Sequence, residues 1–261
     1  MTDLAWRKNM KASWQIIKVV VLSGGWILLG LSAWHFKERI FSRAVSLFSA
    51  DAENVRWKQL VDTRKTDLRK SPWLDDRPQV LMLGDSHVEM GAWYNLFRGR
   101  FAIRNAGLSR AKIRDVTQLA SELSSIKPEI VVCLCGINDL GSGSSAGDAY
   151  RDYLQLLEKI TPAVTAERVI VLSVMPVTQN RLVDKNAQLN AKVVSFNEEL
   201  RDYCAKKGFA YLDVWSALAY NEVLRKEVTS DGLHLNSVGY RKLAEQLEPR
   251  LADLYDKLSG N

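Results

Sequence analysis

The sequence has little of the chemistry that builds metal centres or disulfide frameworks. Its 261 residues include three cysteines and three histidines, and none of them are grouped with the spacing of metal ligands. Three cysteines cannot all pair within one chain. Cys133 and Cys135 lie in an apolar run, and Cys204 lies in a helical pattern. We therefore expect three buried free thiols, no bound metal and no cofactor.

The chain also lacks a broad excess of positive charge outside its N-terminus. Its net charge is +6, but residues 1–45 carry seven Lys or Arg against two acidic residues. The remainder, with 29 basic and 28 acidic residues, is close to neutral. Because a nucleic-acid-binding face needs many cations to contact phosphates, we expect no nucleic-acid partner. The hydrophobic content of 47% is that of a globular protein and excludes a disordered chain.

One long apolar run is present, from Trp14 to Trp34, and its 21 residues include a single charge, Lys18. Roughly 20 apolar residues cross the core of a bilayer. Lys18 is close enough to one end to reach the headgroups, and the two tryptophans suit the interfaces. A cleaved signal peptide is the alternative, but Leu31 and Ala33 match its small-x-small cleavage site poorly. We expect an uncleaved, single-span membrane anchor over residues 14–34.

Basic residues flank both ends of this run, with slightly more of them on the N-terminal side. The positive-inside rule favours a cytoplasmic N-terminus and places the rest of the chain outside the cytoplasm. In a Gram-negative bacterium that compartment is the periplasm, with the anchor in the inner membrane.

Three segments follow from this organisation: residues 1–45 as the anchor with its flanks, 46–77 as a polar and partly helical linker, and 78–261 as the main globular domain. A helix is predicted around Asp51–Lys70, ending before Ser71-Pro72. We interpret it as a solvated spacer, with docking to a membrane-protein partner as the alternative.

From residue 78 onward, apolar runs alternate with helical patterns. Five strands are predicted, near residues 80–83, 101–104, 130–135, 169–174 and 210–214. The main helices are expected over 113–126, 148–160, 187–207 and 237–258. This alternation predicts an α/β fold, a doubly wound, five-stranded parallel sheet with helices on both faces. In such a sheet a site forms at the carboxyl ends of the strands.

Blocks of polar and small residues lie at those strand ends: Gly84-Asp85-Ser86, Asn105-Ala106-Gly107, Gly136-Ile137-Asn138-Asp139 and Asp231-Gly232-Leu233-His234. Each block alone is a weak signal, because such residues are also common in turns and caps. Their order along one α/β domain is more specific. A serine hydrolase needs a nucleophile, a base, a group that orients the base, and donors for the oxyanion.

The base follows by elimination among the three histidines. His35 lies beside the anchor, and His87 directly follows Ser86, where side chains at a helix start diverge. His234 remains, with Asp231 three residues earlier as the partner of its Nδ1. Ser86 is the candidate nucleophile.

Oxyanion donors are expected from three groups. These are the backbone N–H of Ser86 at a helix N-terminus, the backbone N–H of Gly107 and the side-chain amide of Asn138. Asp139 is interpreted as structural, bracing the loop in which it lies.

Together the four blocks resemble the SGNH (GDSL-type) hydrolase superfamily, over about residues 78–256. The resemblance implies a flavodoxin-like sheet, Ser86 as nucleophile, His234 as base oriented by Asp231, and the same three oxyanion donors. The last block and the helix after it look most like the platelet-activating-factor-acetylhydrolase-like and carbohydrate acetylesterase branches. His87 departs from the pattern, which has Leu there.

Other templates fit less well. The Gly-x-Ser-x-Gly motif of α/β-hydrolases needs glycine at position 88, which is Val88. Residues 141–146 formally match a dinucleotide-binding fingerprint, but they start too far after their strand, so we interpret them as a loop at the rim of the site.

The expected function is a membrane-anchored serine esterase that removes short acyl groups, with acetyl as the expected group, through an acyl-Ser86 intermediate. The short connections leave no room for a lid, and an exported polysaccharide is the expected substrate. One alternative is an O-acyltransferase that uses the same triad with a membrane partner. Others are a lysophospholipase- or thioesterase-like lipid esterase and, least favoured, a non-catalytic assembly subunit.

Overall fold

The computed structural model describes residues 52–73, 76–178 and 187–260. The apolar run Trp14–Trp34 lies outside these ranges, so the expected anchor remains a prediction. Within the described ranges, no helix combines the length and apolarity needed to cross a membrane. The sheet lies in the compact unit Lys58–Asn261.

The sheet has five parallel strands in the order β2-β1-β3-β4-β5. They are β1 (Gln79–Gly84), β2 (Ala102–Gly107), β3 (Ile130–Leu134), β4 (Val169–Leu172) and β5 (Ala210–Leu212). Every residue of β3 and β4 is buried, as expected for apolar strands covered on both faces. The predicted doubly wound, flavodoxin-like sheet is confirmed, and its strand order reverses between β1 and β3.

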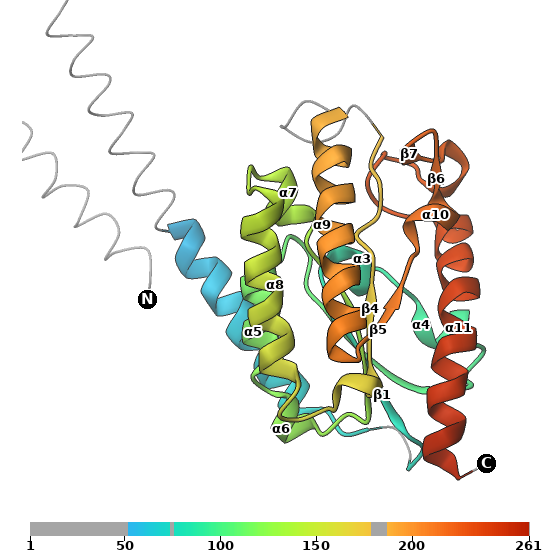
Figure 1. Cartoon of the computed structure of the whole chain (residues 1–261). Coiled ribbons are helices and arrows are strands. Elements are labelled where there is room, and N and C mark those ends of the chain that lie inside the picture. Colours follow the sequence, from blue (N-terminus) through green and yellow to red (C-terminus); the bar gives the residue numbers. More distant parts are fainter. Residues whose placement is uncertain (1–51, 74–75, 179–186, 261) are drawn as a thin grey trace, which may run out of the picture. The chain divides into compact units, whose positions relative to one another are not determined.

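Helices cover both faces of this sheet (Figure 1). One face carries α5 (Ile113–Ala120), α8 (Ala146–Ile160) and α9 (Ala187–Lys207). The other carries α4 (Trp93–Leu96), α10 (Trp215–Leu218) and α11 (Ser237–Ser259). Two short helices, α3 (Ser86–Glu89) and α7 (Ile137–Gly141), begin where β1 and β3 end.

Several short elements differ from the sequence-based expectation. The helix expected over 113–126 is two helices, because α5 ends at Ala120 and α6 (Leu123–Ile126) begins after a break. The hairpin of β6 (Ala219–Tyr220) and β7 (Val223–Leu224) was not predicted. A strand of two residues has no periodicity to detect.

An aromatic cluster anchors α4 between β2 and α11. The Trp93 ring stands edge-on to Tyr240 at 5.8 Å, and Phe97 stands edge-on to Phe101 at 5.4 Å. Trp93 Nε1 also donates to the carbonyl oxygen of Val88 at 2.8 Å. These contacts fix the segment that follows α3 and so hold α3 against the sheet.

The helix expected near Asp51–Lys70 is present over residues 52–70. Val61 and Leu68 on this helix are buried, so it is not wholly a solvated spacer. Glu122, between α5 and α6, forms ion pairs with two cations of the helix, Lys65 at 3.3 Å and Arg69 at 3.2 Å.

The three cysteines are buried and free, as expected from the sequence: Cys133, Cys135 and Cys204.

Candidate active site

Ser86 lies at the first turn of α3, directly after β1. Asp85 caps this helix, and its Oδ1 accepts the backbone N–H of His87 at 3.0 Å. Because β1 borders the point where the strand order reverses, Ser86 faces the crevice in which doubly wound folds bind their ligands. Its side chain is nearly buried, with 6% of the residue exposed.

His234 and Asp231 approach Ser86 from a turn that precedes α11. His234 Nε2 lies 3.2 Å from Ser86 Oγ, and His234 Nδ1 lies 2.8 Å from Asp231 Oδ2. A carboxylate only accepts hydrogen bonds, so the proton of the neutral imidazole belongs on Nδ1. Nε2 is then left with a lone pair facing the serine hydroxyl, the arrangement that a general base requires.

The Asp231 carboxylate is held in its ionised form. Burial alone would raise its pKa, but hydrogen bonds from the His234 side chain and from the backbone N–H groups of Leu233 and His234 outweigh burial. The pKa of Asp231 is therefore well below its usual range. An ionised Asp231 orients the imidazole and stabilises the positive charge that develops on it.

Thr229 builds the turn that carries these two residues. Its Oγ1 donates to the carbonyl oxygen of His234 at 2.7 Å and accepts the backbone N–H of Gly232 at 2.9 Å. Sequence reasoning did not single out Thr229. Its position two residues before an Asp-Gly pair is the signal that could have identified it.

The three expected oxyanion donors differ in their availability. Ser86 N–H has no hydrogen-bond partner among the described residues. Asn138 uses one amide hydrogen on the carbonyl oxygen of Ala111 at 2.9 Å, and its second is left for a ligand. Gly107 N–H donates to Asn105 Oδ1 at 2.8 Å, so this arrangement engages it within the protein.

Gly107 has a packing role that the sequence did not indicate. A Cβ at this position would collide with the backbone of Val88 and Glu89, so only glycine lets the end of β2 lie this close to α3. Asn105 Nδ2 strengthens the contact by donating to the carbonyl oxygens of the same two residues, at 2.8 and 3.1 Å.

Asp139 follows Asn138 and is buried. Its Oδ2 accepts the backbone N–H of Ile113 at 3.0 Å, which ties the loop after β3 to the start of α5, as expected for a bracing residue. Burial raises the pKa of Asp139 to about 6, although the hydrogen bond from Ile113 opposes the shift.

His87 lies beside this chain of residues without joining it. Its ring is buried, and the His87 and His234 ring centroids are 5.6 Å apart. Nδ1 lies 3.2 Å from Asp85 Oδ1, and Nε2 lies 3.0 Å from the carbonyl oxygen of Leu233. The ring thus turns away from the Ser86 hydroxyl, in agreement with the divergence predicted from the sequence.

Comparison with known proteins identifies the family. A model of the GDSL-like Lipase/Acylhydrolase family matches residues 82–242, which is more than half of the chain and spans all four blocks. The chain belongs to this GDSL (SGNH) family. It is accordingly an ester hydrolase of the serine type.

Curated relatives of this GDSL hydrolase cover most of its domain. The platelet-activating factor acetylhydrolase IB subunit alpha2 of Homo sapiens is 28% identical over 196 residues, covering 70% of this chain and 80% of its own length. The GDSL esterase/lipase WDL1 of Oryza sativa subsp. japonica is 23% identical over 199 residues, 66% of this chain and 76% of the relative.

Solved structures share the fold of the GDSL hydrolase. A Streptococcus pneumonia protein described as a platelet activating factor superposes with a TM-score of 0.65 at 20% identity, covering 80% of this chain and 99% of the other. A catalytic mutant of an acetylxylan esterase from Geobacillus stearothermophilus superposes with a TM-score of 0.57 at 14% identity, covering 68% and 95%.

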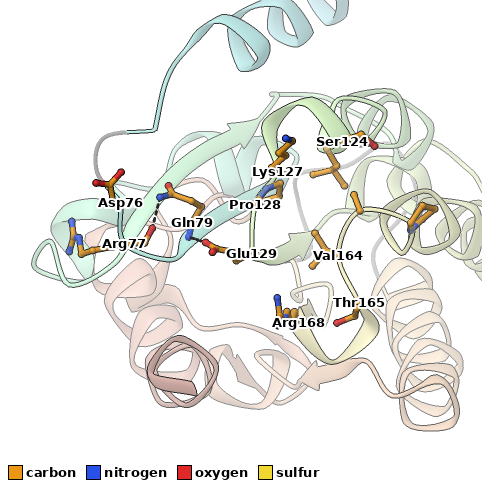
Figure 2. A pocket seen from close by; sticks show the side chains of 13 residues that line it. Asp76, Arg77, Gln79, Ser124, Lys127, Pro128, Glu129, Val164, Thr165 and Arg168 are labelled. Carbon is orange, nitrogen blue, oxygen red and sulfur yellow. Dashed lines mark hydrogen bonds between the residues drawn. The ribbon is translucent and has the colours of Figure 1, made fainter. Parts of the chain in front are cut away.

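Two of the hollows formed by the described residues lie at different distances from Ser86. A cavity of about 730 Å³ lies at the opposite end of the sheet, where Gln79 and Glu129 mark the starts of β1 and β3 (Figure 2). The six residues of β1 span roughly 17–20 Å, so this cavity is not part of the candidate site. A groove of about 620 Å³ begins much closer, between Met90 and Leu235.

Among the described residues, no group of His, Cys, Asp or Glu could hold a metal ion.

Proposed function

We propose that this GDSL hydrolase removes short acyl groups, above all acetyl, from a polysaccharide through an acyl-Ser86 intermediate. The observation that carries the proposal is the continuous hydrogen-bonded chain from Ser86 Oγ through His234 to Asp231. At one end of this chain lies Ser86, whose own backbone N–H is available to a ligand.

The reaction has two halves. Ser86 Oγ attacks the ester carbonyl while His234 Nε2 takes the hydroxyl proton, and Ser86 N–H and the Asn138 amide stabilise the oxyanion. His234 returns the proton to the departing alcohol oxygen, which leaves an acyl-Ser86 ester. Water then attacks that ester with His234 again as base, and the acid is released with Ser86 restored.

Two features support a short acyl group. The connection from β1 to α3 is a single residue, Asp85, and that from β3 to α7 is two residues, Cys135 and Gly136, which leaves little chain for a lid at these strand ends. The names of a curated relative and of a structural neighbour, an acetylhydrolase and an acetylxylan esterase, both specify removal of acetyl groups.

A polysaccharide substrate is supported by the surroundings of the site. The groove between Met90 and Leu235 starts one residue after His234 and one helical turn after Ser86, so it is placed to take the alcohol part of the ester. It is lined by apolar side chains and by the polar side chains of Asn95, Arg98 and Arg241. The proposed anchor over residues 14–34 would hold the enzyme at a membrane facing an exported polymer.

The test compares 4-nitrophenyl acetate, 4-nitrophenyl octanoate and an O-acetylated polysaccharide, with the full-length chain and Ser86→Ala. We expect faster turnover of the acetate than of the octanoate, acetate release from the polymer, and loss of all three activities in Ser86→Ala. Faster octanoate turnover would reassign the substrate to lipids. Transfer of acetyl to an added glycan, in place of release to water, would identify an O-acyltransferase.

A further inference from the structure

The protons on the His87 ring can be counted from its two hydrogen bonds. Nε2 lies 3.0 Å from the carbonyl oxygen of Leu233, and a carbonyl oxygen only accepts, so Nε2 carries a proton. Nδ1 faces Asp85 Oδ1 at 3.2 Å, and that oxygen already accepts the backbone N–H of His87. An ionised Asp85 accepts hydrogen bonds only, so a bond at this oxygen calls for a proton on Nδ1 as well, and a ring with both protons is an imidazolium.

These two bonds join the two halves of the candidate site. Asp85 caps the helix whose first residue is Ser86, and Leu233 lies inside the turn that carries Asp231 and His234. A third element joins through the backbone, because Tyr240 on α11 donates its hydroxyl proton to the carbonyl oxygen of His87 at 2.8 Å.

The charged groups around His87 favour its doubly protonated form. Burial alone would lower the pKa of His87, but the Asp85 hydrogen bond and charge, the Leu233 carbonyl and the Asp231 charge outweigh it and raise the pKa. Burial raises the pKa values of the Cys135 thiol and the Tyr240 hydroxyl, so neither of these groups carries a charge at neutral pH.

The geometry points to His87 as a positioning residue, a buried imidazolium that ties the Ser86 turn to the 231–234 turn and sets the separation of Ser86 Oγ from His234 Nε2. This inference rests on the proposed function only for its effect on rate.

The proton count is tested on the unaltered full-length chain by ¹⁵N–¹H correlation spectra of the imidazole rings. The chain has only three histidines, so His35→Gln and His234→Gln variants assign the spectra. We expect both His87 ring nitrogens to be protonated at pH 7.5, with shifts constant down to pH 5.5. A single-proton, neutral His87 tautomer at pH 7.5 would overturn the inference, whatever the activity of the enzyme.

The positioning role is tested with two variants and 4-nitrophenyl acetate. The side-chain amide of His87→Gln can still donate to the Leu233 carbonyl but carries no charge, whereas His87→Leu loses both. We expect kcat to fall about 10²-fold in His87→Leu, as for a displaced catalytic group, and less than about 10-fold in His87→Gln. KM for 4-nitrophenyl acetate should change little in either variant, because the proposed role is to hold Ser86 and His234 at the right separation and not to bind the ester.

His35→Gln is the matched control and should match the wild type. Wild-type kcat in both His87 variants would refute the positioning role. Thermal midpoints measured in parallel separate a displaced catalytic group from misfolding, because a variant that folds normally keeps the wild-type midpoint while its kcat falls. If Ser86→Ala keeps full activity, the proposed function fails, while the spectra still decide the protonation of His87.

Discussion

Asn138 is the side chain at the site with a hydrogen left to donate. One amide hydrogen is donated to the Ala111 carbonyl oxygen, and the other has no partner among the described residues, which leaves it for the proposed oxyanion. Because this second bond strengthens only as charge develops, it belongs to the transition state more than to the bound substrate.

We therefore expect Asn138→Ala to lower kcat about 10²–10³-fold with little change in KM for 4-nitrophenyl acetate. Steady-state kinetics beside wild type and Ser86→Ala measure this. A wild-type kcat in Asn138→Ala would show that Asn138 does not bind the oxyanion. Of the three proposed donors, Ser86 N–H would then be the one that is not engaged by another group of the protein.

At the scale of elements, Asp139 links the end of β3 to the start of α5. Its raised pKa, to about 6, means that the folded chain binds a proton more tightly than the unfolded chain, whose Asp pKa is near 3.9. The folded state therefore binds more protons between about pH 4 and 6, and this group's contribution to stability is lost as pH rises through that window.

Asp139→Asn should abolish this dependence, because an amide oxygen can still accept the Ile113 N–H and carries no charge to desolvate. From pH 7 to pH 4 the free energy of unfolding of the wild type should rise by about 2 kcal/mol relative to the variant. Urea unfolding at the two pH values gives the difference. Equal pH dependence in the two proteins would show that Asp139 titrates as an ordinary carboxyl.

The helix over residues 52–70 is stabilised by a few buried side chains. Leu68 is 4% exposed, whereas Leu60 on the same helix is 46% exposed. Truncating a buried leucine to alanine typically costs 2–5 kcal/mol, and an exposed one costs little.

We expect Leu68→Ala to lower the free energy of unfolding by about 2–4 kcal/mol, and Leu60→Ala by less than about 0.5 kcal/mol. Urea denaturation of the full-length proteins measures both. Equal, small effects would mean that the helix does not pack on the domain in solution.

Helices and strands with a clear periodic spacing of apolar residues could be predicted from the sequence, and short or interrupted elements could not. Helix α9 has the predicted bounds, Ala187–Lys207, because Gly208 with a φ of +81° ends it cleanly. The break after Ala120 was missed because the apolar pattern continues through it into α6. The ion pairs between Glu122 and the helix over residues 52–70 join residues more than 50 positions apart, so no local sequence pattern predicts them.

At the scale of the whole molecule, the reactive residues of the site were more predictable from the sequence than the hydrogen bonds that hold them in place. Ser86, Asp231 and His234 carry reactive groups of recognisable kinds in a recognisable order, and the fold brings them within hydrogen-bonding distance. The engagement of Gly107 N–H by Asn105 depends on side-chain direction at the end of β2. The bridge through His87 depends on the direction of a side chain in α3, and neither feature follows from the spacing of residues in the sequence.

The proposed membrane anchor is testable on the full-length chain. We expect it to remain with membranes after carbonate extraction, because about 20 apolar residues insert stably in a bilayer. The same chain with two arginines introduced into the run, at Val21 and Leu28, should be released, since each charge opposes insertion at the centre of the bilayer. Release of the unaltered chain would exclude a spanning segment over residues 14–34.

The central claim is that Ser86 is acylated during turnover, and the most direct measurement is mass spectrometry of the protein quenched with acid during hydrolysis of 4-nitrophenyl acetate. We predict a single added acetyl group on the peptide that contains Ser86, absent from Ser86→Ala, and longer-lived in His234→Gln if any forms. Continued hydrolysis by Ser86→Ala, or an acetyl group that accumulates on another residue at the rate of turnover, would contradict it.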